Sequence, residues 1–327
     1  MIIPSRAAGI ADTVNRKLEQ LMPVLTPLGI ALGFTLPGIF INLRPLVPWL
    51  FSVITFSGAL KMKAAEFGKT MRSPLPILLF FFSAHVLMPL TAWFLSSLFF
   101  RAETDTVTGF ILLFSAPTAV SCFIWVNMFR GDRALCLTVI LLDTLLAPLL
   151  TPLSISVLMG AKTAMNMSGI AVSLILMVVV PTIIGVTVNE TSRGKIPGFV
   201  CPYLNPVSKI CLMLVIAANA SPLASRISFG DPKVWGIAVL CVALSLTGYL
   251  FSKLAAITGR CNAEKSVTLF FSGGLRNISA VTTIAIGFFP EAAALPALFG
   301  IMFQQTLAAL MGKLMLGKNK KAAEAGS

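Results

Sequence analysis

The chain has 327 residues, of which 57% are hydrophobic and only 11% carry a charge. Because soluble domains carry about a quarter charged residues, this composition argues against a soluble protein and predicts an all-α protein that crosses the membrane several times. The net charge of +13 is typical of the basic loops that orient membrane proteins, so no nucleic-acid binding is expected.

The predicted spans follow a polar N-terminal segment. Residues 1–20 lack the apolar core and small-residue cleavage site of a secretory signal. Beyond them, apolar stretches alternate with charged or Pro/Gly-rich breaks, and several reach the roughly 20 residues that a spanning helix needs. Ten spans are predicted, the first two short and proline-bearing, at residues 21–38, 46–60, 75–100, 107–129, 134–159, 168–189, 204–223, 234–257, 266–289 and 293–316.

The basic residues support this count and predict an orientation. With ten spans, 19 of the 25 Lys and Arg residues fall on the side of the membrane that holds both termini. Arg276 lies inside a span, and the other five are Arg44, Arg101, Lys162, Arg226 and Lys233. Because basic loops stay in the cytoplasm, we expect both termini there, in a bacterial inner membrane.

The two halves of the chain resemble each other. Leu113–Pro117 aligns with Phe270–Gly274, and further on Asp143–Ala147 aligns with Gln305–Ala309. Five spans in each half would make the two repeats face opposite ways across the membrane. Inverted repeats are the architecture of many secondary transporters, whose sites lie near the midplane where broken helices meet.

The repeat predicts paired helix breaks in spans four and nine. Span four contains Pro117, which removes a backbone donor and crowds the preceding turn. Span nine contains Gly273 and Gly274, and each glycine weakens a helix by about 1 kcal/mol. These breaks either form a binding site or reflect helix packing alone, since proline and glycine are common in membrane helices.

Arg276, beside the second break, is the most informative residue in the chain. A guanidinium at membrane depth costs between about 2.5 and about 17 kcal/mol, so it is rarely kept without a partner or a water-lined cavity. Asp143, in the middle of an apolar run, is the expected ion-pair partner. The pair is either part of a functional site or a strut that locks span five to span nine.

Three further polar residues interrupt apolar runs. His85, the only histidine, is either a proton carrier or a packing residue. Gln304 and Gln305 lie together in the last span, where Gln305 matches Asp143 in the repeat. We group Asp143, His85, Gln304 and Gln305 as candidates for ion pairing or proton coupling.

Small polar residues flank both breaks, and they either bind a ligand or join helices by hydrogen bonds. The candidate substrate-binding set is Arg276, Asn277, Thr118, Ser121, Ser272, Gly273 and Gly274. The six cysteines lack the spacing of a zinc site and are expected to be small buried side chains, so no metal or cofactor is expected. No catalytic set is present in the sequence, so an enzyme is not expected.

Several segments, in order, resemble the bile acid:sodium symporter superfamily over nearly the whole chain. They are Phe56–Leu60, Met88–Trp93, Arg130–Asp132, Ala147–Pro152 and Gly274–Asn277. The resemblance implies panel helices over residues 21–64 and 168–223, core helices over 74–160 and 234–316, and a cytoplasmic tail over 317–327. It further implies that spans four and nine cross at unwound middles, and that transport is an elevator-like or rocking movement.

The chain departs from this family at the positions of its sodium ligands. By alignment, those positions hold Ser272, Arg276, Cys122, Phe123, Cys136, Ile140 and, in span three, Ala84 or His85, whereas Asn277 is retained. Sodium needs several hard oxygen ligands, which thiols, a phenyl ring and an aliphatic chain do not supply. We therefore expect Arg276 to replace bound sodium, with transport by uniport, by anion exchange or by proton coupling.

The sequence as a whole predicts a secondary transporter of organic anions that works by alternating access. The resemblance implies substrates from bile acids and steroid sulfates to small carboxylates such as pantoate and pyruvate. The expected partners are an organic anion, the lipid bilayer and protons as one alternative, and the oligomeric state is left open. Three other functions stay open: sodium-coupled transport through a different ligand set, a channel, and a receptor without transport activity.

Overall fold

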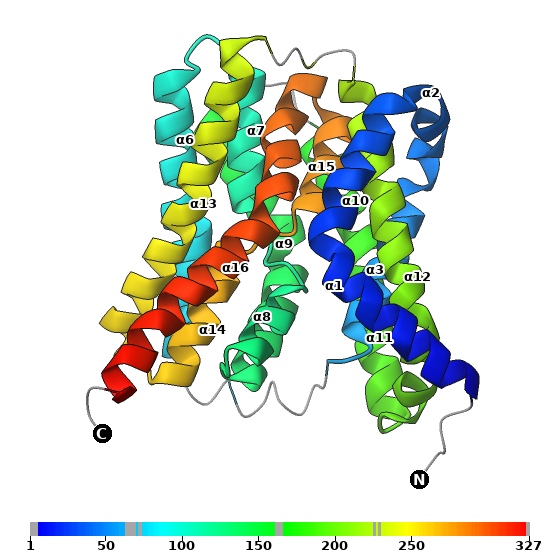
Figure 1. Ribbon diagram of the computed structural model, residues 1–327. Helices are drawn as coiled ribbons and strands as arrows, with labels where there is room; N and C mark the ends of the chain where they lie inside the picture. The colour runs from blue at the N-terminus through cyan, green and yellow to red at the C-terminus, as the bar shows by residue number, and fades with distance from the viewer. Residues whose placement is uncertain are drawn as a thin grey trace.

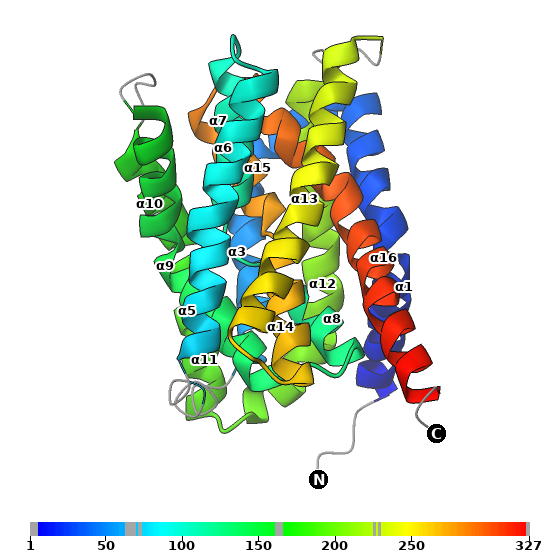
Figure 2. The same ribbon diagram turned by 90° about the vertical axis from the view of Figure 1, so that its left-hand side faces the viewer.

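The structure is a computed structural model that describes residues 6–62, 70, 74–160, 166–224, 227 and 230–324. All the secondary-structure elements of these residues are helices, as expected for an all-α membrane protein. Figures 1 and 2 show long helices that run side by side, with α16 crossing the others obliquely. Both termini lie at the same end of the molecule, called here the terminal end (Figure 1).

Helices occupy each of the regions predicted as spans, although several of their bounds differ from the prediction. In chain order they are α1 (Arg6–Thr35), α2 (Pro37–Phe40), η1 (Ile41–Leu46), α3 (Val47–Ala59), α5 (Leu75–Phe82), η2 (Ser83–Leu87), α6 (Met88–Phe99), α7 (Thr104–Ser115), α8 (Cys122–Met128), α9 (Arg133–Met159), α10 (Met167–Leu174), η4 (Ile175–Val179), α11 (Val180–Thr191), α12 (Lys195–Ala220), η5 (Ser221–Leu223), α13 (Pro232–Thr258), α14 (Ala263–Gly274), α15 (Ile278–Phe288), η6 (Glu291–Ala294) and α16 (Leu295–Glu324). The first helix begins well before the predicted residue 21, and the last continues through part of the predicted tail.

By length and hydropathy, seven of the described helical segments are able to cross a membrane: Pro37–Ala59, Leu75–Phe99, Arg133–Met159, Met167–Thr191, Lys195–Leu223, Pro232–Thr258 and Glu291–Leu314. Two shorter apolar helices, Thr104–Ser115 and Ile278–Phe288, belong to the regions predicted as spans four and nine. The chain is therefore an integral membrane protein, whereas the count of ten spans and the inverted repeat stay predictions.

Side-chain caps fix where several helices begin. Asp132 accepts a hydrogen bond from Leu135 N at 2.9 Å at the start of α9, and Asn262 accepts one from Lys265 N at 3.0 Å at the start of α14. Such caps satisfy amides that the first turn of a helix leaves free. They fix the entry of α9 and α14, the two helices that carry Asp143 and the Gly273–Gly274 pair.

Two helices contain a widened π-helical turn before a proline. η2 precedes Pro89 and η4 precedes Pro181, each with one residue in between. Because proline has no N–H and crowds the carbonyl of the preceding turn, a wider turn relieves the clash without ending the helix. The turn at η2 matters for the site, because it holds His85.

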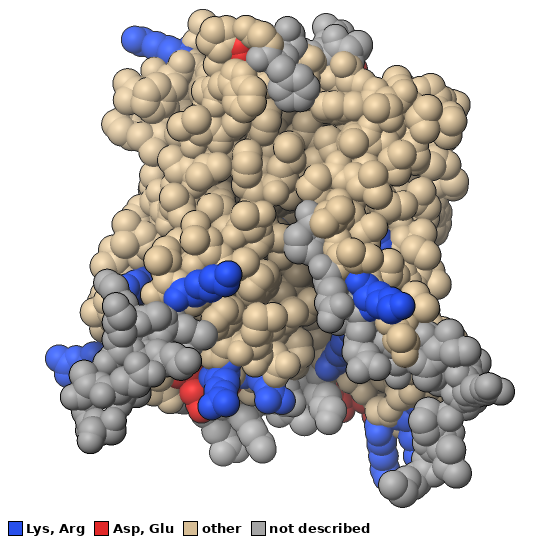
Figure 3. Space-filling model, in the orientation of Figure 1, with Lys and Arg blue, Asp and Glu red and all other residues tan. Residues whose placement is uncertain are grey.

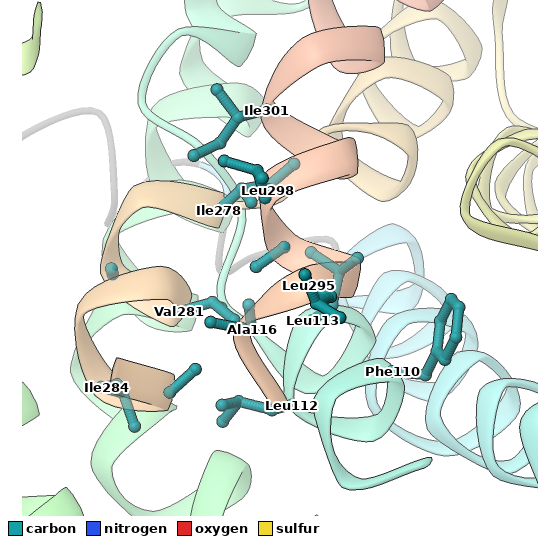
Figure 4. Close-up of a cluster of buried hydrophobic side chains, with 14 of the residues drawn as sticks. Phe110, Leu112, Leu113, Ala116, Ile278, Val281, Ile284, Leu295, Leu298 and Ile301 are labelled. Carbon is teal, nitrogen blue, oxygen red and sulfur yellow. The ribbon is translucent and has the colours of Figure 1, made fainter. Parts of the chain in front are cut away.

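The helices pack in two groups. α1 and α3 pack along α12, and α3 also packs against α11, whereas α13 packs along α14 and α16, and α6 along α7. Figure 4 shows side chains of α7, α15 and α16 directed into one buried cluster that includes Leu113, Val281 and Leu298. In lipid such clusters are stabilised mainly by close van der Waals packing.

Lys and Arg side chains gather toward the terminal end, below a broad uncharged band (Figure 3). This distribution agrees with the bias predicted from the sequence, although it does not assign that end to one side of the membrane. Among the residues counted for that bias, Lys63, Lys69, Arg72, Lys162 and Arg226 lie outside the described residues.

Candidate functional site

Two extended segments, one between α7 and α8 and one between α14 and α15, cross near the middle of the molecule. Thr118 and Arg276 form an antiparallel bridge between them. Asn277 N donates a hydrogen bond to Pro117 O at 2.8 Å beside this bridge. The crossing therefore satisfies backbone groups that the interrupted helices leave free, as non-helical backbone at membrane depth requires.

The two interruptions have different local causes. Pro117 disfavours a helical residue before it, and Ala116 is extended, with φ −62° and ψ 151°. At the other interruption, glycines allow a close approach between α14 and α13. A Cβ atom on Gly274 would lie 2.1 Å from the ring of Tyr249, and one on Gly273 would lie 1.6 Å from Ser252 Oγ.

The guanidinium of Arg276 is bound by two carbonyl oxygens, one in the break after α7 and one in η2. Its Nη1 donates to Ala116 O at 3.2 Å and its Nη2 to Ala84 O at 3.4 Å, and the residue is 2% exposed. Its backbone N donates to Gln304 Oε1 at 2.8 Å. A fixed positive charge thus lies under the crossing and joins the break after α7 to η2 and α16.

The carbonyl of Ala84 is free to bind Arg276 because of the π-helical turn. In a regular α-helix this oxygen would accept from Met88 N, but Met88 N bonds to Ser83 O instead. In a π-helical turn each carbonyl pairs with the amide five residues later. The partner of Ala84 O would then be Pro89, which has no N–H. The sequence therefore leaves one unpaired carbonyl at the depth of Arg276, and the guanidinium satisfies it.

Asp143, fully buried on α9, binds both the crossing and η2. Its Oδ2 accepts from Thr118 N at 2.7 Å, and its Oδ1 lies 2.7 Å from His85 Nε2. Both His85 and Asp143 have side chains that are almost inaccessible, 5% and 0% exposed. His85 also stacks on Phe81, with ring centroids 5.5 Å apart.

The direct pair expected between Asp143 and Arg276 is absent from the ion pairs of the described residues. His85, which lies in the π-helical turn η2, takes that place. Arg276 does not form an ion pair with the Asp143 carboxylate, but its positive charge stabilises the negative charge of that carboxylate electrostatically. The two charges nevertheless converge on the same break, since Arg276 binds Ala116 O and Asp143 binds Thr118 N.

A cavity of about 150 Å³ lies on the face of the crossing that is turned toward α3 and α12. Its polar lining comes from Thr55, Ser121, Arg276, Asn277, Ser279, Gln304 and Gln305, and its apolar lining includes Phe51, Leu212 and Ile216. Ser121 is the N-cap residue of α8, and Asn277 caps α15 by accepting from Ala280 N at 3.4 Å. Two helix N-termini therefore meet at one cavity.

The structure divides the predicted substrate-binding set. Arg276, Asn277 and Ser121 line the cavity, whereas Thr118, Ser272, Gly273 and Gly274 are outside its lining. The hydroxyl of Thr118 donates to Ser272 O at 3.0 Å, which ties the two broken helices together. Of the predicted ion-pairing set, Asp143 and His85 meet each other, while Gln304 and Gln305 line the cavity.

The side chains aligned with sodium ligands also come together, but with different chemistry. Cys122 Sγ lies 3.5 Å from Ser272 Oγ and 3.9 Å from Cys136 Sγ, and all three residues are buried. Ile140 is buried as well. The described residues hold no cluster of three or more His, Cys, Asp or Glu side chains that would bind a metal ion.

Some contributors to the site were not anticipated from the sequence. Ile216 and Leu212 line the cavity, and Trp125 Nε1 donates to Gln305 Oε1 at 3.1 Å. The backbone carbonyl oxygens of Ala84 and Ala116 could not be identified from residue type, because every residue has such an oxygen. Only the X-Pro pattern at Pro89 and Pro117 marks the turns where such oxygens are left free.

Comparison of the sequence with known proteins finds one matching family and several similar proteins. The pattern of the sodium bile acid symporter family matches residues 47–228. The Bacillus subtilis protein YbaS, whose function is uncharacterised, is 40% identical over 294 residues, which are 90% of this chain and 96% of YbaS. YocS of the same organism, described as an uncharacterised sodium-dependent transporter, is 24% identical over 90% of both chains. The rice chloroplast protein BASS2, a probable sodium/metabolite cotransporter, is 26% identical over 73% of this chain and 58% of its own length.

Proposed function

Because the chain belongs to the sodium bile acid symporter family, we propose that it is a secondary transporter of small organic anions that works without sodium. The observation that carries this proposal is the guanidinium of Arg276, held under the crossing by two backbone carbonyls. Carbonyl oxygens are ligands of the kind that hold hard cations. Arg276 supplies a permanent positive charge to them and takes the role of a bound cation.

The thiol-rich cluster supports the absence of a sodium site. Cys122 and Cys136 offer soft sulfur atoms, and Ser272 Oγ is already 3.5 Å from one of them. A hard monovalent cation needs several oxygen ligands around it, which this cluster does not provide. The names of the relatives YocS and BASS2 refer to sodium, and this chain would differ from them at this cluster.

The size of the cavity favours a small carboxylate over a bile acid. Its volume of about 150 Å³ is well below the roughly 300–1,000 Å³ typical of sites for drug-sized ligands. The N-terminus of α15, capped by Asn277, presents partial positive charge to an anion in this cavity. Asn277, Ser121, Gln304 and Gln305 would then orient the carboxylate, while Phe51 and Leu212 pack against its apolar part.

Transport by alternating access requires the two groups of helices to separate on one side at a time. Away from the terminal end, two polar contacts join them: Arg44 Nη2 donates to Ile286 O at 3.2 Å, and Asn219 Nδ2 donates to Thr283 Oγ1 at 3.1 Å. Both contacts link α15 to η1 or α12. We propose that they break when the cavity opens to that side, which would face away from the cytoplasm.

The test is uptake of radiolabelled pyruvate, pantoate and benzoate into proteoliposomes, in sodium and in potassium media. We expect a transported carboxylate whose uptake rate is the same in both media. Arg276→Gln should abolish uptake, because it removes the charge bound to Ala84 O and Ala116 O. Arg276→Lys, which keeps a positive charge, should retain part of the activity. Uptake that depends steeply on sodium and is unchanged in Arg276→Gln would refute the proposal and favour a sodium-coupled carrier.

A further inference from the structure

The charges at the crossing sum to zero before any substrate binds. Arg276 is cationic, and Asp143 accepts hydrogen bonds at both carboxylate oxygens, one of them from the amide of Thr118. An anion that enters the adjacent cavity would therefore bring an uncompensated negative charge to membrane depth. Such a charge is costly at membrane depth, where charges are screened less than they are in bulk water.

His85 offers a position for the proton that would restore neutrality. Its Nε2 faces Asp143 Oδ1, and its Nδ1 has no hydrogen-bond partner although it is buried. Because an ionised carboxylate only accepts hydrogen bonds, Nε2 carries the hydrogen shared with Asp143, and Nδ1 is the ring nitrogen without a partner. Nδ1 is thus the vacant proton position of the His85–Asp143 pair.

Few other ionisable groups lie near the imidazole. η2 packs against α5, α6, α7 and α13, and α9 contributes Asp143. Asp105 on α7 and Lys233 on α13 lie in the end turns of their helices, Lys253 on α13 is exposed, and Cys241 bonds to Pro296 O at 3.5 Å. α5 and α6 carry no charged side chain. Asp143, Arg276, Tyr249, whose ring packs at Gly274, and the thiols of Cys122 and Cys136 remain as ionisable groups near the break.

We infer that His85 and Asp143 form the proton-binding site of a proton–anion symporter, in which one proton binds together with one monovalent carboxylate. The inference rests on the proposed function and names its coupling ion. With the proton on His85, the charges of Arg276, His85, Asp143 and the bound anion sum to zero. The proton comes from water on one side of the membrane and returns to water on the other, so the protein is unchanged after each cycle.

The coupling is reciprocal. A bound anion makes protonation of His85 more favourable, and a protonated His85 makes the anion bind more tightly by the same factor. Thr118 connects the two, because its amide binds Asp143 while its backbone pairs with Arg276 beside the cavity. Anion affinity should therefore fall as the pH rises through the range in which histidine loses its proton.

The chain allows a direct test, because His85 is its only histidine. The full chain, labelled with 15N-histidine and freed of its purification tag, is reconstituted in lipid and studied by solid-state NMR between about pH 5 and pH 8. We expect the neutral ring to carry its hydrogen on Nε2. At a fixed pH, adding a carboxylate that stabilises the protein in a thermal-shift assay should raise the ratio of protonated to neutral imidazole about tenfold.

His85→Gln is the matched variant, since its amide N–H replaces the donor to Asp143 but does not titrate. We expect it to bind the same carboxylate with an affinity that does not change with pH. If a bound carboxylate leaves the protonation of His85 unchanged, or if His85→Gln keeps the pH dependence of the wild type, the inference fails while the proposed function stands. If pyruvate, pantoate and benzoate all fail to bind, the proposed function fails and the inference with it.

Discussion

The two interrupted helices reach the same crossing by opposite means. The break between α7 and α8 begins at Pro117, and its free backbone groups are bound by charged side chains: Ala116 O by Arg276 and Thr118 N by Asp143. The break between α14 and α15 follows a pair of glycines, whose role is steric. There α14 contacts α13 so closely that a side chain on Gly274 would overlap the ring of Tyr249.

This difference shows that two segments of one site can be stabilised by different interactions. The proline break is bound by charged side chains, Arg276 and Asp143. The glycine break is packed closely against α13. Substitutions at the two breaks should therefore cause losses of stability that differ in size.

The largest effect is expected at the charge-bound break. Asp143→Ala leaves Arg276 without its nearby counter-charge and removes the acceptor of Thr118 N and His85 Nε2. Removing one member of a buried charge pair costs about 3–5 kcal/mol, so the apparent thermal midpoint in detergent should fall sharply.

The control for that prediction is Asp143→Asn, which keeps the shape and one acceptor oxygen but loses the charge. It should destabilise less than alanine. An unaltered thermal midpoint in Asp143→Ala would show that the break is not held by this carboxylate.

A smaller loss is expected at the glycine break. A Cβ atom on Gly274 would lie 2.1 Å from the Tyr249 ring, so Gly274→Ala should cost about 1–3 kcal/mol through overpacking. Gly287→Ala is the matched control, because no heavy atom lies within 4 Å of its Cβ position.

A double-mutant cycle checks the mechanism of this loss. In a Tyr249→Ala background, Gly274→Ala should cost much less, since the ring that it meets is gone. Equal costs in both backgrounds would contradict the steric account and point to the backbone of Gly274 itself.

The smallest effect is expected at Pro117. Pro117→Ala removes a conformational restraint, which is worth about 0.4–1 kcal/mol, but it leaves the bridge between Thr118 and Arg276 in place. A loss comparable to that of Asp143→Ala would show that the proline, and not the charges, maintains the break. The thermal midpoints of the two variants, measured in the same detergent, decide between these accounts.

Much of the fold followed from hydropathy and from local sequence. Proline and glycine have fixed effects on a helix, so Pro117 and the Gly273–Gly274 pair marked both breaks to within a few residues. The burial of Arg276 and Asp143 followed from their positions in apolar runs. These features depend on chemistry that acts within one segment.

The pairing of those charges did not follow, because it depends on contacts between segments. Asp143 binds His85, which lies in the π-helical turn η2 of another segment. The acceptors of the Arg276 guanidinium are backbone oxygens, which have no residue-type signal. The cavity likewise combines α3, α12 and α16 with the crossing, and hydropathy does not specify which faces of those helices meet.

The most direct test of the central claim is the binding of radiolabelled sodium to the purified, reconstituted protein. The account predicts no saturable sodium binding, with or without a carboxylate ligand, because Arg276 already supplies the positive charge and Cys122 and Cys136 replace oxygen ligands. Arg276→Gln should not create such binding, since the thiols remain. Saturable sodium binding that Ser272→Ala abolishes would contradict the account and establish a sodium-coupled carrier.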